Sequence, residues 1–169
     1  MEINWFIAIS CTFIPLIIGM LWYSKFLFGN AWLKEIGMTV ENTKKVNMGR
    51  AVAVSLLLGA FISTAMVVWT IHQMGFFSVF GGPADQALLK DPTSSLSLYT
   101  ADFMSKYGQN FRTFKHGALH GVLGALFIVL PSYGISAVWE QRSFKYVAMH
   151  VGYWMVCMAL IGGIICQWA

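Results

Sequence analysis

Charged residues are scarce in this chain of 169 residues: only 11% are Asp, Glu, Lys or Arg, whereas 57% are hydrophobic. Four stretches contain no charged side chain at all over the ~20 residues that an α-helix needs to cross a bilayer. A soluble domain of this length cannot bury so much apolar surface. The scarcity of charge therefore excludes an ordinary soluble protein and indicates a polytopic membrane protein.

The charge-free stretches also indicate the type of secondary structure. They are longer and more continuous than the strands of a membrane barrel, which alternate between polar and apolar residues. They predict an all-α fold, in which one membrane domain over residues 1–169 forms a bundle of four transmembrane helices. We expect the spans at about 3–24, 51–74, 116–139 and 146–168.

Lysine and arginine are unevenly distributed over the three connections. Seven lie in or beside the two short connections, four lie in the long second connection at 75–115, and the two termini have none. Because cytoplasmic loops are enriched in Lys and Arg, we expect both termini and the loop 75–115 outside the cytoplasm, in a bacterial inner membrane. The net charge of +4 is then a signal of topology, and nucleic acid is not an expected partner.

Aromatic residues recur at helical spacing in the second half of that loop. The stripe consists of Tyr99, Phe103, Tyr107, Phe111 and Phe114, and the polar residues lie largely off it. This pattern predicts an amphipathic helix over about 98–114. We expect the helix to lie on the outer membrane surface; the alternative is a helix that caps the bundle.

Small residues recur on single faces of the spans. The second span has Ala51, Ser55, Gly59 and Ser63 at intervals of four, and the third has Gly117, Gly121 and Gly124. Close contact between such faces is a main source of helix association in lipid. The stripes predict packing between helices of the chain, with a homo-oligomer or a larger membrane complex as further partners beside the lipid bilayer.

One segment after the first span, LWYSKFLFGNAW, combines aromatic rings with a single lysine. Rings of Trp and Tyr are enriched at membrane interfaces, and a lysine there extends its charge to water while its stem stays among the rings. The pattern predicts an aromatic belt at the membrane interface, and a ligand-binding surface is the alternative. The belt residues are Trp22, Tyr23, Lys25, Phe28 and Trp32.

The same segment carries a family resemblance. The chain has an Asn-Trp pair near its N-terminus, then GMLWYS and LFGNAW, and a last span with GYW and GGI. These features resemble the small membrane proteins grouped as domain-of-unknown-function family 1761. The resemblance implies a four-span fold and, because the family has no assigned activity, no catalytic residue.

Only the histidines suggest chemistry. His116 and His120 lie one helical turn apart at the start of the third span, and His72 lies near the end of the second, so all three fall at a similar membrane depth. Three imidazoles can hold one metal ion and leave a position open, and Asp102 is the best nearby carboxylate. The alternative is a set of interfacial histidines that bond with headgroups or across helices.

Other chemical motifs are missing from the sequence. It has no HExxH, no CxxC and no pair of carboxylates within a span, and its three cysteines are of the kind that packs as small apolar groups. No catalytic residue and no enzymatic activity are therefore predicted. The sequence favours an accessory or packing protein; a small channel or transporter, or a protein that binds a metal ion or haem at the histidines, are the alternatives.

Overall fold

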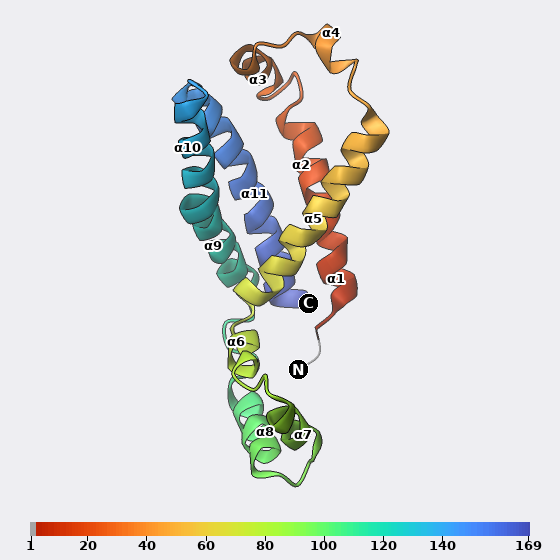
Figure 1. Cartoon of the computed structure of the whole chain (residues 1–169), viewed down its shortest axis with the longest axis vertical. Helices are drawn as coiled ribbons and strands as arrows, with labels where there is room; N and C mark the ends of the chain where they lie inside the picture. Colours follow the sequence, from red (N-terminus) through yellow and green to blue (C-terminus); the bar gives the residue numbers. More distant parts are fainter. Residues whose placement is uncertain (1–2) are drawn as a thin grey trace.

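The computed structural model describes residues 3–169, which form helices and turns and contain no strand. Four helices are long and apolar enough to cross a membrane (Figure 1): they are Trp5–Trp22, Met48–Thr70, Phe114–Trp139 and Phe144–Trp168. The predicted all-α fold with four spanning helices is confirmed, and the chain is an integral membrane protein.

The four spans are built from eight helical segments. The first comprises α1 (Trp5–Ser10), the 3-10 turn η1 (Cys11–Phe13) and α2 (Ile14–Trp22), and the second is α5 (Met48–Thr70). The third comprises α9 (Phe114–Gly124), the π-helical turn η2 (Ala125–Val129) and α10 (Leu130–Trp139), and the fourth is α11 (Phe144–Trp168). Two short helices, α3 (Gly29–Ile36) and α4 (Val40–Thr43), connect the first two spans.

The sequence explains where these helices begin and why two of them are interrupted. Side chains of Asn47, Thr113 and Ser143 each accept a hydrogen bond from a backbone N–H in the first turn of α5, α9 and α11, which is the usual helix start. Pro15 and Pro131 each follow a turn that is not α-helical. Proline lacks an N–H and its ring clashes with the preceding turn, so the helix must adjust there.

Helices α9 and α11 pack most closely, through glycines. A Cβ added at Gly117 would overlap the carbonyl of Gly162, and one added at Gly121 would overlap the carbonyl of Met158. The glycines thus let the two backbones touch, as the small-residue stripe of the third span predicts. On the other side of the bundle, a Cβ at Gly59 of α5 would lie 2.8 Å from the carbonyl oxygen of Thr12.

The larger core cluster draws its buried residues mainly from α1, η1, α5, η2 and α11, and it lies toward the end of the bundle where the N- and C-termini lie (Figure 1). Its fully buried side chains come mostly from α5 and α11; they include Met66, Val67, Ile71, Ile161 and Ile165. At the opposite end the helices spread apart in Figure 1. The end with the termini is therefore the better packed one, and it is the end that carries the histidines of the third span.

The long loop forms an extension beyond this end of the bundle (Figure 1). It contains α6 (His72–Ser78), α7 (Pro83–Lys90) and α8 (Ser95–Tyr107). The helix expected over about 98–114 ends at Tyr107, because the chain turns before Thr113 caps α9. Its aromatic stripe packs within the extension: the ring of Phe103 stacks on Phe76 of α6 at 4.1 Å between centroids.

Candidate metal centre

The three histidines predicted to share a site lie together, although they come from segments 44 residues apart in the chain. His72 is the first residue of α6, and one residue separates it from the end of α5 at Thr70. Ile71, between the two helices, is extended and fully buried. Its burial in the core fixes the turn that brings His72 over α9, where His116 and His120 occupy one face.

The imidazole nitrogens of the three rings converge. The Nε2 atom of His116 lies 2.8 Å from Nε2 of His72 and 3.1 Å from Nε2 of His120. One nitrogen from each ring lies within 4.8 Å of the others. Ligands ~2.0–2.1 Å from a tetrahedral zinc ion are about 3.3 Å apart. Small side-chain adjustments would therefore bring the three nitrogens to the spacing of a metal-binding face.

The donor set consists of nitrogen alone. Asp102, the carboxylate suggested by the sequence, is exposed and bonds to Lys106 of its own helix at 2.7 Å. It does not belong to the group of potential ligands found among residues 3–169. Three neutral imidazoles leave the full charge of a divalent ion uncompensated, and such a site suits zinc, copper, iron or nickel better than calcium or magnesium. It also leaves a coordination position for water or another ligand.

Phe111 forms one wall of the site in an unusual backbone conformation. Its φ angle is 62°, a region that costs a residue with a side chain on the order of 1 kcal/mol. Its ring centroid lies 5.1 Å from that of His116, and its carbonyl accepts bonds from Cys166 Sγ and the Thr113 N–H. These contacts hold the strained turn against the histidines.

Acid is expected to release a bound metal ion. Each Nε2 must be free of its proton to bind the ion. Protons and the ion therefore compete for the same nitrogens, and the apparent affinity for zinc should fall as the pH is lowered. Zinc titrations across ~pH 5.5–7.5 would test this expectation. An affinity that does not change with pH would contradict coordination by histidine.

The residues predicted to form an aromatic belt lie at the opposite end of the bundle. Lys25 and Phe28 are exposed, whereas Trp22, Tyr23 and Trp32 are only partly exposed because they contact other parts of the protein. Trp22 packs on Phe28, and Tyr23 packs on Trp32. The belt itself stays a prediction, and these contacts show that several of its rings also stabilise the connection.

His150 lies near the Tyr23 ring, far from the other three histidines along the bundle. The hydroxyl of Tyr23 lies 3.0 Å from His150 Nδ1, and the ring of Tyr133 stacks on His150 at 4.9 Å between centroids. The sequence did not indicate this cluster, because its members come from three different spans with no common spacing. Sequence reasoning also missed Phe111, whose conformation no motif predicts.

Comparison with known proteins assigns the chain to a family. No curated protein matches it, and no solved structure matches it. One family model, described as a protein of unknown function (DUF1761), matches residues 6–166, which is nearly the whole chain. The resemblance in the N-terminal segment and the last span is thereby confirmed: the chain belongs to the DUF1761 family of proteins of unknown function.

Proposed function

We propose that this membrane protein binds a divalent first-row transition-metal ion, with zinc as the representative, through His72, His116 and His120. The observation that carries the proposal is the convergence of their three Nε2 atoms, at 2.8 and 3.1 Å from His116. Two histidines on one helical face recur often by chance. A third histidine, 44 residues away along the chain but with a ring nitrogen close to those of the other two, supports a shared ligand.

The position of the histidines suggests what the ion does. The trio is partly exposed at the end of the bundle that carries the long loop, and the excess of Lys and Arg in the other two connections supports an external location for this end. An ion held there by three nitrogens keeps a position for an external ligand. It can bind that ligand or polarise a water molecule as a Lewis acid.

A single ion fits the histidines better than haem does. A haem with two axial histidines needs a flat macrocycle between the two rings. Here the ring centroids lie only 4.6–4.9 Å apart in each pair, and no such gap separates them. The convergence of the rings is also why we prefer metal binding to the accessory role that the sequence favours.

Equilibrium dialysis of the purified protein in lipid nanodiscs against zinc tests the proposal. We expect one ion per chain, measured by elemental analysis, and none above background in a variant with all three histidines changed to Ala. A Lys115→Ala variant is the matched control, because Lys115 is exposed and adjoins His116 without belonging to the trio. Zinc bound equally by the wild type and the triple variant would overturn the proposal.

A further inference from the structure

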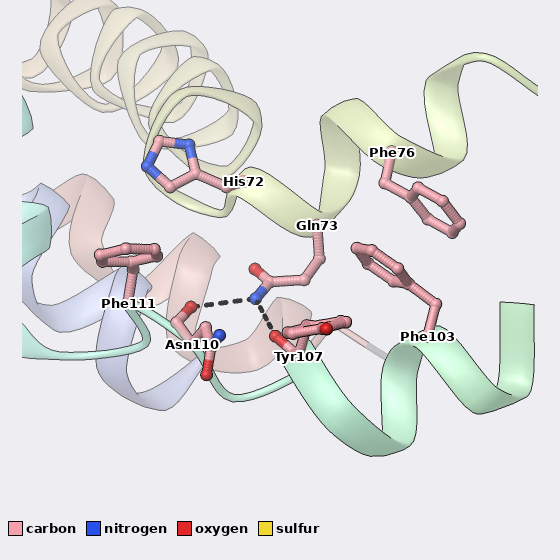
Figure 2. A pocket seen from close by; sticks show the side chains of 7 residues that line it. All are labelled: His72, Gln73, Phe76, Phe103, Tyr107, Asn110 and Phe111. Carbon is pink, nitrogen blue, oxygen red and sulfur yellow. Dashed lines mark hydrogen bonds between the residues drawn. The ribbon is translucent and has the colours of Figure 1, made fainter.

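A second feature adjoins the histidines: a cavity of about 300 Å³ between α6, the end of α8 and the turn that leads to α9. Four aromatic rings line it, from Phe76, Phe103, Tyr107 and Phe111, together with His72 and Gln73 (Figure 2). Its size is at the lower end of the range for small-molecule sites. A ligand of one or two rings therefore fits the cavity.

One polar group in this cavity is held in a fixed orientation. Gln73 is only 5% exposed, and its side-chain Nε2 donates to the carbonyls of Tyr107 at 3.1 Å and Asn110 at 3.0 Å. Both amide hydrogens are used, so the orientation of the amide is determined. Its oxygen then points to the side on which His72 and Phe111 lie (Figure 2).

The oxygen of Gln73 has no hydrogen-bond partner among the described residues. Buried polar atoms in native proteins are nearly always paired, and an exception calls for an explanation such as a ligand. A carbonyl oxygen only accepts hydrogen bonds. The partner that completes this site must therefore bring a donor, such as a hydroxyl group.

The other residues that line the cavity indicate the charge and the shape of the ligand. No Asp, Glu, Lys or Arg of residues 3–169 lines the cavity, so a charged ligand would be buried without a counter-charge. Stacked and edge-on contacts between aromatic rings favour a flat aromatic partner over an aliphatic one. From these features we propose that the cavity binds a neutral aromatic alcohol, a phenol or hydroquinone, whose hydroxyl donates to Gln73.

His72 joins this cavity to the histidine trio, because its ring lines the cavity and its Nε2 lies 2.8 Å from that of His116. A ring bound beside Gln73 would lie next to the metal ion, and its hydroxyl oxygen is a suitable ligand for the open coordination position. This connection rests on the proposed metal-binding function. The cavity and its unpaired acceptor stand without it.

Fluorine NMR with 4-fluorophenol and 4-fluoroanisole tests the proposal on metal-free protein in nanodiscs. The two probes share a ring, but only the phenol carries a donor. Saturable binding of the phenol is expected, with the anisole at least ~10-fold weaker because the Gln73 oxygen stays unpaired. Nanodiscs without protein correct for partition into lipid. Equal affinity for the two probes, or no saturable binding of the phenol, would overturn the proposal.

Variants locate the bound probe. Phe103→Ala removes the ring that stacks on Phe76 and should weaken fluorophenol binding at least ~10-fold. Phe127→Ala is the matched control, because Phe127 is 75% exposed on η2 and does not line the cavity. Equal losses in the two variants would place the probe elsewhere and overturn the assignment. The comparison of phenol with anisole needs no substitution, so it decides the proposal even if Phe103→Ala misfolds.

A parallel titration with zinc separates this proposal from the metal-binding function. Fluorophenol binding without zinc binding would support the proposed cavity ligand and overturn the metal site. Zinc binding without fluorophenol binding would support the metal site and overturn the proposed cavity ligand. When both bind, zinc should tighten fluorophenol binding ~10-fold, since the ion offers the hydroxyl oxygen an additional contact. An unchanged affinity would overturn the connection through His72.

Discussion

Replacing His116 by Ala should weaken zinc binding by more than ~100-fold, the upper range of loss when a residue that only supports a metal ligand is changed. His116 is the central member of the trio, because its Nε2 lies within 3.1 Å of both other Nε2 atoms. Its removal leaves His72 and His120 as a pair of ligands without the third nitrogen. Competition with a coloured zinc chelator measures the change in affinity.

Two controls decide whether a loss in His116→Ala is specific. Lys115→Ala changes the neighbouring exposed side chain and should bind zinc like the wild type. Circular dichroism should show the same helix content in both variants, because the Thr113 side chain that caps α9 remains. If His116→Ala keeps its affinity while folded, the ion is held by other residues and the site assigned to the histidines is wrong.

Substituting Gly121 by Ala should destabilise the bundle by about 1–3 kcal/mol or more, the usual cost of forcing an extra methyl group into a packed interface. The added Cβ would overlap the carbonyl of Met158 on α11, and backbone atoms cannot move aside without separating the helices. We expect a lower free energy of unfolding, measured by titration with sodium dodecyl sulfate in mixed micelles.

Gly134 provides the matched control for this substitution. It lies in α10, where an added Cβ would meet no atom within 4 Å. Gly134→Ala should therefore keep the stability of the bundle or raise it by up to ~1 kcal/mol, because alanine restricts the unfolded chain and favours a helix. Equal loss of stability in the two variants would show that close contact between α9 and α11 is not what holds the bundle together.

The spans were predictable from the sequence because a bilayer imposes a simple requirement. A helix that crosses it must be apolar over a set length, and each charge-free stretch of that length overlaps one of the four spans, although the second continues past the end of α5 at Thr70. The contact of Gly117 and Gly121 with α11 was also indicated, since small residues at helical spacing mark close packing in lipid. Such local sequence patterns are therefore sufficient to predict the spans and the contact between these helices.

The candidate site was predictable only in part. The sequence placed His72, His116 and His120 at a similar membrane depth, which led to the hypothesis of a shared site. In the structure the three side chains lie together. The turn at Ile71 depends on burial in a core formed by other helices, which no local pattern reveals. The unpaired oxygen of Gln73 likewise depends on two carbonyls more than 30 residues away. Features that arise from long-range contacts were therefore beyond sequence reasoning.

X-ray absorption spectroscopy of the zinc-loaded protein tests the metal site most directly, since it reports the atoms bound to the ion. We expect three imidazole nitrogens at ~2.0–2.1 Å and a fourth, light ligand such as water. The same spectrum of His116→Ala should lose an imidazole contribution or show no stoichiometric zinc. A wild-type spectrum dominated by sulfur at ~2.3 Å, or one without imidazole, would contradict coordination by the three histidines.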